Sequence, residues 1–487
     1  MRAEEPQSSL HGQVRRAVIW VAIRQIAVRG LSILQLLVLV RILSPEDFGL
    51  FAIAMMVYAF VEAMTFLGFG HALIQKKTVE PADLNTIYVV NVVRGILLAL
   101  LVWAASYPVG MLMKSPASQP LIAIIGFLPL IMGFYNPAMI LFQKELRMKQ
   151  EFSFYSAGAL ANLLLSLWFA MRGAGVWALI WGLLAQSMAQ LVLSYVVQKY
   201  RPKFEFNKTN FAEMFHFGKW LLASQGLKYF SNNLPSWIIG QYFGANSLGQ
   251  YHVAGRFSQA IGNEFTTLIS TVAFPSFSKL QSDIGRLSEV YIRSQRIVLS
   301  AAFLLFGCLI ALSESIATVV LGEKWSDAGS LIMLLSILGA LQSIGSQSEI
   351  LKALNKTRYL YQINAIRLFF IIISIIPLCD WFGAKGAVVS IVATLIFLVP
   401  IGQIIILKEL KIPSMSFIKI VSPPALSAAA MYMTSVGIIG MPIGLPSFTK
   451  NGCILIATYA LTLFLLDKMI GSLIFHEWKF ILFKVFK

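Results

Sequence analysis

The sequence predicts an all-α polytopic membrane protein, and three observations lead to that fold class. Apolar residues make up 57% of the 487 residues, whereas Asp, Glu, Lys and Arg together make up only 13%. A soluble chain of this length needs more polar surface to cover its core. The apolar residues gather in long runs, and the basic residues gather between alternate runs.

About fourteen runs approach the roughly 20 predominantly apolar residues that a transmembrane helix needs. The runs at 217–241 and 248–273 are the most polar of the set. We place the expected helices at 17–40, 48–69, 85–107, 121–142, 154–171, 175–197, 217–241, 248–273, 297–320, 329–351, 359–378, 385–407, 417–439 and 451–470.

The basic residues predict how these helices are oriented. Of the 39 Lys and Arg residues, 26 lie in or beside the two termini and every second loop. Only six lie in or beside the alternate loops, namely Arg41, Lys114, Arg172, Lys324, Lys385 and Lys450. Cytoplasmic loops carry such an excess, so we expect both termini to be cytoplasmic. The same excess accounts for the net charge of +17, and no basic stretch has the aromatic pattern of a nucleic-acid-binding domain.

Two short polar stretches suggest an internal repeat. RILSPEDFGLF occupies 41–51 and QYFGANSLGQY occupies 241–251, and a shift of 200 positions aligns Gly49 with Gly249. We therefore expect two pseudo-symmetric six-helix lobes, parallel because six is an even number of crossings. Chance similarity between two polar helical hairpins is the alternative. The expected divisions are a cytoplasmic N-terminus 1–16, an N-lobe 17–197, a basic cytoplasmic linker 198–216, a C-lobe 217–407, two further helices within 408–470, and an amphipathic basic cytoplasmic tail 471–487.

The first of these stretches also predicts where a helix begins. Ser44 is a suitable N-cap, and Pro45 suits the first helical position. Glu46 and Asp47 then fall in the first turn, where carboxylates suit the helix dipole. We expect a helix to start at this outer turn.

Polar side chains within the runs are costly in lipid, so they indicate partners or water. Gln25, Arg29 and Ser32 recur on one face of the first expected helix. Lys228 and Asn232 recur in the same way on one face of the seventh expected helix. At about 1.5 Å per residue, Arg29 and Lys228 lie close to the middle of the bilayer. We expect these five residues, with Arg94, Arg256 and Arg367, to line a hydrated cleft that binds substrate. Helix–helix hydrogen bonding without a ligand is the alternative.

Three further charges form a separate group. Arg24 and Glu62 both lie about 10 Å from the expected inner helix ends, so they can pair. Glu264 falls two places from the counterpart of Glu62 under the 200-residue shift. We interpret Arg24, Glu62 and Glu264 as structural or coupling ion pairs.

Several signals of other functions are absent from the sequence. It has no G-x-x-x-x-G-K-[ST] phosphate loop, no H-E-x-x-H motif and no Cys/His cluster, so we expect no ATPase site, no metal site and no cofactor. No expected outer loop exceeds about a dozen residues, which leaves little room for a catalytic domain. These features favour a transporter over an enzyme.

The block from Arg24 to Lys77 resembles a known family. Its R-x-L-x-P-x-D-F-G-L and G-F-G-x-A-L-I-Q patterns are similar to the first two helices of bacterial polysaccharide transporters. These are the Wzx-type exporters of the multidrug/oligosaccharidyl-lipid/polysaccharide flippase superfamily. The resemblance covers the whole chain in length and plan, but only this block is specific.

The resemblance implies a function and a location. It implies two six-helix lobes around a central cleft, with two extra C-terminal helices, in the bacterial inner membrane. The implied substrate is an oligosaccharide on undecaprenyl diphosphate, which is moved to the outer leaflet for exopolysaccharide, capsule or O-antigen synthesis. Membrane lipids, and the polymerase and other polysaccharide-assembly proteins, are the implied partners.

The charges within the runs are compatible with an anionic substrate. Seven are basic and four acidic, and arginine suits phosphate because it forms bidentate hydrogen bonds. Three alternatives stay open: a multidrug or cation antiporter of the same superfamily, a polymerase or ligase of the same pathway, and a purely structural scaffold, which would not need paired polar stripes. The antiporter requires an acidic cleft, and the enzyme a substantial outer loop. The charges are Arg24, Arg29, Arg94, Lys219, Lys228, Arg256 and Arg367 against Glu62, Glu264, Glu314 and Glu349.

The basic pattern gives a first testable prediction. Reporter fusions are expected to place Lys203 and Lys479 in the cytoplasm and Lys114 and Lys324 outside, because the basic bias alternates along the whole chain. A fusion after Lys324 that reports a cytoplasmic position would contradict the two-lobe plan.

The C-terminal tail mixes apolar residues with Lys479, Lys484 and Lys487, which is typical of an interfacial helix on an anionic leaflet. We expect deletion of 474–487 to leave export largely intact.

Overall fold

A computed structural model describes residues 7–65, 78–145, 147–279, 283–344, 356–439 and 445–477, together with Phe69, Leu73, Lys76, Ile350, Leu351 and Leu354. Throughout these residues the regular structure is helical, which confirms the all-α class. The chain divides into two compact units, Met1–Gly249 and Gln250–Lys487.

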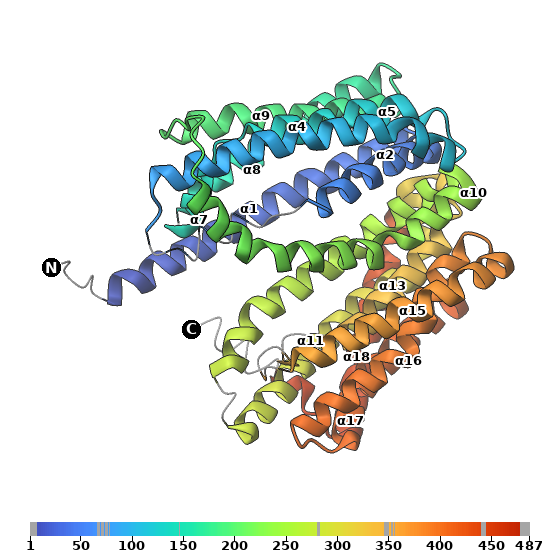
Figure 1. The fold of residues 1–487 in the computed structure, drawn as a ribbon. Helices are drawn as coiled ribbons and strands as arrows, with labels where there is room; N and C mark the ends of the chain where they lie inside the picture. The colour runs from blue at the N-terminus through green and yellow to red at the C-terminus, as the bar shows by residue number, and fades with distance from the viewer. Residues whose placement is uncertain are drawn as a thin grey trace. The chain divides into compact units, whose positions relative to one another are not determined.

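The first unit is built from helices that overlap the predicted runs, although the run at 121–142 is divided among four short helices and α10 continues from the run at 217–241 into the next. In it, α8 packs against both α1 and α9, and α4 packs against α5 and α6 (Figure 1). Its helices are α1 (Gln7–Ile42), α2 (Pro45–Ala63), α4 (Pro81–Leu112), α5 (Ser118–Ile125), α6 (Phe127–Gly133), η1 (Pro137–Met139), α7 (Ile140–Lys144), α8 (Met148–Met171), α9 (Trp177–Val197) and the first part of α10 (Lys208–Lys279).

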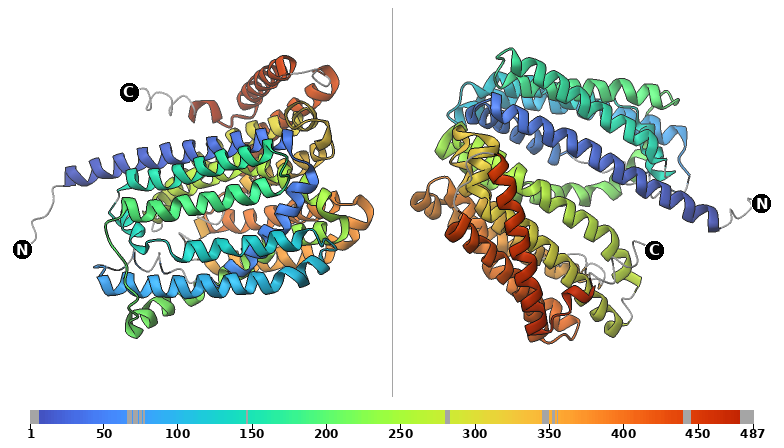
Figure 2. Two further views of the ribbon diagram at one scale, coloured as in Figure 1. Left: turned by 90° about the horizontal axis from the view of Figure 1, so that it is seen from above. Right: turned by 180° about the vertical axis from the view of Figure 1, so that it is seen from behind.

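The second unit holds the rest of α10 and the helices that follow. Within it α11 packs against α13 and α17, and α15 packs against α16 (Figure 2). Its helices are α11 (Ile284–Ala311), α12 (Ser313–Ser315), η2 (Ile316–Leu321), η3 (Glu323–Trp325), α13 (Ala328–Ile344), α15 (Thr357–Phe382), α16 (Lys385–Glu409), α17 (Ser414–Thr434), η4 (Ser435–Ile439) and α18 (Leu445–Ile470).

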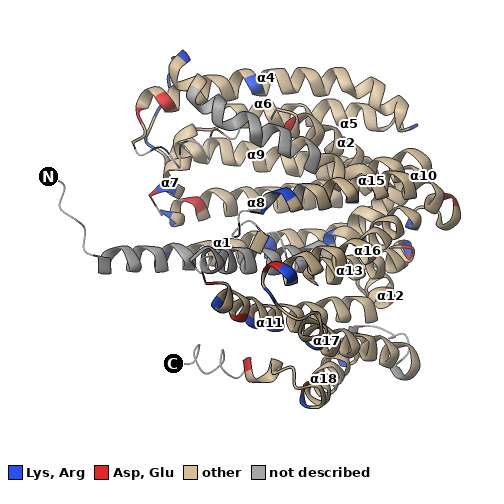
Figure 3. Cartoon of the chain, turned by 60° about the horizontal axis from the view of Figure 1, so that its bottom comes forward, with Lys and Arg blue, Asp and Glu red and all other residues tan. Residues whose placement is uncertain are grey.

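Helix length and composition identify a multi-pass membrane protein. Among the described residues, eight helices are long and apolar enough to cross a membrane. A ninth crossing results if Ser118–Gly133 and Pro137–Lys144, which meet at an angle of 68°, form one broken span. Charged residues gather mainly at helix ends, and the lengths between them are largely uncharged (Figure 3).

The start of α2 has the predicted cap. The backbone N–H of Asp47 donates to Ser44 Oγ (3.2 Å), and the Asp47 carboxylate accepts from the Ser44 N–H (2.9 Å). Pro45 is the first helical residue. Asp47 also accepts a hydrogen bond from the Val176 N–H at 2.9 Å, so the cap fixes the start of α2 against the start of α9.

The two repeated stretches meet in the first unit. A Cβ on Gly49 would lie 1.7 Å from the carbonyl oxygen of Ala245, and one on Gly249 would lie 1.8 Å from the carbonyl oxygen of Pro45. The 200-residue shift converts one contact into the other, as in a contact about a two-fold axis. Gly244, with a φ of 79°, breaks α10 immediately before this contact. We call Pro45, Gly49, Ala245 and Gly249 the glycine seam.

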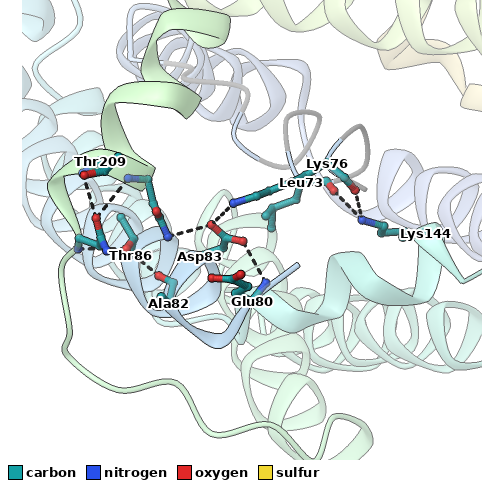
Figure 4. Close-up of polar contacts among 10 residues, drawn as sticks. Leu73, Lys76, Glu80, Ala82, Asp83, Thr86, Lys144 and Thr209 are labelled. Atoms are coloured by element: carbon teal, nitrogen blue, oxygen red, sulfur yellow. Dashed lines mark hydrogen bonds and ion pairs between the residues drawn. The ribbon is translucent and has the colours of Figure 1, made fainter. Parts of the chain in front are cut away.

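The linker docks on the first turns of α4, where three polar residues are buried. Asn85 Nδ2 donates to Glu205 (2.8 Å), and Asn210 Nδ2 donates to Asp83 (2.9 Å). Thr86 Oγ1 accepts from the Asn207 N–H at 3.2 Å. Figure 4 shows the part of this cluster around Asp83 and Thr86, where Lys76 pairs with Asp83 at 2.7 Å. These bonds place the linker on the first unit.

An aromatic side chain of the linker reinforces the docking. The Tyr200 hydroxyl donates to the Pro81 carbonyl at 3.1 Å, and the Tyr200 carbonyl accepts from Asn136 Nδ2 at 2.7 Å. Burial, followed by the nearby Glu205 carboxylate, raises the pKa of Tyr200. The hydroxyl therefore remains a protonated donor at neutral pH.

The start of the tail is also anchored. Glu477 is buried and forms ion pairs with Arg293 (2.6 Å) and Arg296 (3.5 Å) of α11. Asp467 accepts from the Ile474 and Phe475 N–H groups at 2.9 and 3.1 Å. The rest of the predicted interfacial helix, 478–487, lies outside the described residues.

The seam gives a second prediction. Gly49→Ala is expected to destabilise the protein by about 1–3 kcal/mol, because a methyl group at this position overlaps a backbone oxygen that cannot rotate away. The loss of thermal stability in detergent measures this. Gly452→Ala is the matched control, because nothing lies within 4 Å of a Cβ there. Equal melting temperatures for the two variants would contradict the close contact.

Candidate functional site

The predicted polar face of α1 divides into two parts. Gln25 and Arg29 are half-buried and Ser32 is exposed, with Ser32 Oγ donating to the Val28 carbonyl of its own helix at 2.9 Å. One turn further on, Gln35 Nε2 donates to Asn162 Oδ1 and Ser166 Oγ, both at 2.8 Å. The C-terminal end of this face therefore forms hydrogen bonds between α1 and α8.

The matching face of α10 is described only in part. Asn232 is exposed, whereas the side chain of Lys228 lies outside the described residues. Between them, the Tyr229 hydroxyl donates to the Met56 carbonyl of α2 at 2.8 Å and accepts from Trp237 Nε1 at 2.9 Å. Tyr229 thus fixes this part of α10 against α2.

Arg24 has a different partner from the one the sequence suggested. We expected it to pair with Glu62, but its Nη1 lies 2.6 Å from Glu151 Oε2 on α8. Its guanidinium also lies 5.1 Å from the centre of the Tyr155 ring. The correction follows from packing, because α1 lies along α8. Gln143 donates to the other carboxylate oxygen of Glu151 at 2.5 Å. We interpret the pair of Arg24 and Glu151 as structural.

Glu62 instead belongs to a polar cluster between α2, α4 and α6. Arg94 of α4 donates from Nε to Thr65 Oγ1 (3.2 Å) and from Nη2 to the Glu62 carbonyl (3.4 Å), and its charge interacts with the Glu62 carboxylate. The Tyr58 hydroxyl lies beside the same carboxylate and also contacts Met132 Sδ at 3.3 Å. These groups surround a cavity of about 110 Å³. The sequence predicted both charges but not that they lie beside one cavity.

The second unit holds two of the predicted cationic residues. Arg256 of α10 lies within a predicted membrane-crossing run, and its side chain keeps accessible surface although the protein packed around it desolvates the guanidinium. Arg256 lies twelve residues after Gly244, a distance of about 18 Å along the helix. Arg367 of α15 is half-buried, and its Nε has no hydrogen-bond partner among the described residues. The side chain of Glu264 lies outside those residues.

An apolar cavity of about 460 Å³ lies between α11, α13 and α17. Gly307, Ala340, Ala425, Ala428 and Ala429 contribute to its walls. Small side chains on three packed helices leave this space. The sequence does not predict this cavity, although the alanine-rich stretch at 425–430 is a signal of close packing on α17.

These features define a multi-pass helical membrane protein with buried ion pairs inside its helical units. Residues 38–330 match the family described as polysaccharide biosynthesis protein. The match covers more than half of the chain, so the chain belongs to this family. The resemblance seen in the sequence is thereby confirmed.

The individual relatives are only distantly similar to this chain in sequence. The chain is 26% identical over 370 residues to the lipopolysaccharide biosynthesis protein WzxC of Escherichia coli (strain K12), covering 75% of each chain. It is 25% identical over 326 residues to the succinoglycan biosynthesis transport protein ExoT of Rhizobium meliloti (strain 1021), covering 66% of each. It is 24% identical over 336 residues to the teichuronic acid biosynthesis protein TuaB of Bacillus subtilis (strain 168), covering 69% of this chain and 70% of that one.

Solved structures show the same fold. The lipid II flippase MurJ in an inward closed conformation matches with a TM-score of 0.71 at 14% identity, covering 93% of this chain and 98% of that one. A multidrug resistance MATE family transporter in an inward-facing conformation matches with a TM-score of 0.62 at 15% identity, covering 81% of this chain and 99% of that one. The fold is therefore shared by proteins with different named substrates.

The Arg24–Glu151 pair gives a third prediction. Glu151→Gln is expected to cost about 3–5 kcal/mol, because Arg24 keeps its charge in a largely buried position without a carboxylate. The yield of monodisperse protein in detergent and its melting temperature report the loss. Glu145→Gln is the control, since Glu145 forms an exposed pair with Arg147 (3.3 Å) and such pairs contribute at most about 1 kcal/mol. Equal stability for the two variants would contradict the structural role of the buried pair.

Proposed function

We propose that this protein is a flippase for lipid-linked oligosaccharides. It moves oligosaccharide units carried on undecaprenyl diphosphate from the inner to the outer leaflet of the bacterial inner membrane. The observation that carries the proposal is the family match over 38–330. The product then serves the assembly of exopolysaccharide, capsule or O-antigen.

The names of the relatives support a transport role. WzxC, ExoT and TuaB are named for lipopolysaccharide, succinoglycan and teichuronic acid biosynthesis, and ExoT is named a transport protein. MurJ, which shares the fold, is named a lipid II flippase. The glycans differ between these names, so the shared feature that we carry to this chain is a saccharide, and its lipid carrier follows the name of MurJ.

The charges favour this substrate over a cationic drug. MATE transporters share the fold, so the fold alone does not separate the two functions. Arg256 is exposed within an apolar run, and Arg367 keeps a buried Nε with no partner among the described residues. A cation at that depth requires water or an anion. A diphosphate meets that requirement, whereas a cationic drug does not.

The mechanism that we propose is alternating access. Fourteen crossings form two six-helix lobes and two further helices, with both termini cytoplasmic. The lobes rock about a cleft that opens to one leaflet at a time. Gln25, Arg29, Ser32, Lys228 and Asn232 bind the polar head group, together with Arg94, Arg256 and Arg367.

A cellular experiment tests the function. Depletion of the protein is expected to leave lipid-linked oligosaccharide in the inner leaflet, where a membrane-impermeant glycosidase added to spheroplasts cannot reach it. Restoring the gene restores access. Unchanged access in depleted cells would contradict the proposal. A membrane enzyme of the same pathway would instead change the chemical form of the glycan, which mass spectrometry detects.

The cleft residues give a fourth prediction. Arg29→Ala and Lys228→Ala are each expected to reduce export several-fold with normal protein levels, because each removes a cation that holds the diphosphate. Surface polysaccharide measured in a complementation assay reports export. Arg29→Lys retains activity if charge alone is required and loses it if bidentate geometry is required. Lys450→Ala, in the last predicted outer loop, is the control, and wild-type export by both alanine variants would contradict the role of these residues.

A further inference from the structure

An open apolar groove lies between α1 and α8 in the first unit. Its volume is about 710 Å³, and its walls include Gly30 and Leu31 of α1 and Phe152 and Leu160 of α8. A Cβ on Gly30 would meet nothing within 4 Å, so this glycine leaves the groove open on its α1 side. Ile26, which also lines it, is 75% exposed. The groove therefore opens toward the membrane and not into the protein.

The length of the groove matches one leaflet of a bilayer. Its wall on α8 extends from Phe152 to Leu160, which is about 12 Å of helix. One leaflet contributes about half of a hydrocarbon core of roughly 30 Å. The groove therefore suits an acyl chain of a single phospholipid, whereas an undecaprenyl chain is far longer than the groove.

A lysine and a tryptophan stand together at one end of the groove. Lys149 lies on the same face of α8 as Ser156 and Leu160, which follow it by seven and eleven residues and line the groove. The Lys149 ammonium lies 5.9 Å from the centre of the Trp20 ring. Trp20 in turn packs on Phe152, with 5.5 Å between the ring centres. This arrangement is typical of the membrane surface, where tryptophan is enriched.

The charge at this end of the groove is positive. Arg16 of α1 and Lys149 of α8 are both exposed. Glu145 and Glu151, the carboxylates closest to Lys149 in the sequence, form ion pairs with arginines. Basic side chains near a membrane surface attract anionic lipid head groups. In the predicted orientation this end of α1 and α8 faces the cytoplasm, so the head group belongs to the inner leaflet.

We propose that the groove between α1 and α8 binds one anionic phospholipid of the inner leaflet. Its phosphate lies near Lys149 and Arg16, and an acyl chain lies along Gly30. A second copy of the chain fits the groove less well, because a two-fold contact there would bring like charges together.

The bound lipid would reinforce a helix that the protein itself covers sparsely. Only 17% of the most apolar part of α1 is buried. A lipid that contacts both helices stabilises the packing of α1 on α8, since any ligand of the folded state stabilises that state. This role goes beyond the proposed flippase function and does not depend on it.

Native mass spectrometry of delipidated protein in detergent tests the site. The probes are dioleoyl phosphatidylglycerol, which is anionic, and dioleoyl phosphatidylcholine, which is zwitterionic. Wild-type protein is expected to prefer phosphatidylglycerol by about fivefold for each cation, and Lys149→Gln to lose about fivefold of that preference. Gly30→Leu is expected to lose one bound phosphatidylglycerol, because the leucine side chain occupies the groove. Phosphatidylglycerol is expected to raise the melting temperature of wild-type protein more than that of Gly30→Leu.

Two matched variants control for charge and for helix propensity. Lys408 is an exposed lysine in the last turn of α16, and Gly452 of α18 has nothing within 4 Å of its Cβ. Lys408→Gln and Gly452→Leu are each expected to bind phosphatidylglycerol like wild type. If Lys408→Gln weakens binding as much as Lys149→Gln, the lipid responds only to overall charge and the proposal is wrong.

Other outcomes also overturn the proposal. Equal affinity of wild-type protein for the two lipids does so, as does wild-type binding of phosphatidylglycerol by monodisperse Gly30→Leu. Undecaprenyl phosphate that displaces phosphatidylglycerol at equal concentration would show that the groove holds the carrier of the proposed substrate. A dimer of the wild-type protein that Gly30→Leu converts to a monomer would show that a second copy occupies the groove.

Discussion

A charged side chain inside an apolar helix must meet an opposite charge or water, and this constraint organises the whole molecule. Arg24 meets Glu151 at 2.6 Å and fixes α1 on α8. Arg94 donates to Thr65 and to the Glu62 carbonyl beside a small cavity, and so joins α4 to the end of α2. Arg256 is exposed within its apolar run. The same residue type therefore serves structural contacts and a proposed substrate cleft, according to what surrounds it.

The glycine seam adds a second constraint, which is backbone proximity. Gly49 and Gly249 each lie so close to a backbone that even a methyl group overlaps it. The two contacts exchange under a shift of 200 residues, so the pair is consistent with an internal repeat. Together with the Tyr229 bond to Met56, the seam keeps α2 and the first part of α10 packed along most of their shared length.

Hydropathy and capping residues predicted the helices, because those signals are local. Ser44, Pro45 and Asp47 marked the start of α2 correctly. The partner of a side chain on another helix was harder to predict. Helical periodicity shows which face of its own helix a residue occupies, but not which helix packs against that face. For this reason Arg24 was assigned to Glu62 when it pairs with Glu151. The docking of the linker on Asp83, Asn85 and Thr86 and the break between α6 and α7 also depend on packing that the sequence does not reveal.

The central claim is that the chain itself moves a lipid-linked oligosaccharide between leaflets. The most direct measurement is the rate at which a fluorescent lipid-linked oligosaccharide becomes accessible to dithionite in vesicles that contain only purified protein and lipid. The account predicts that all of the probe becomes accessible with wild-type protein. In empty vesicles, and in vesicles with heat-denatured protein, only the outer half is expected to be bleached. If the inner half stays protected in the presence of folded wild-type protein, the chain is not a flippase for this class of lipid.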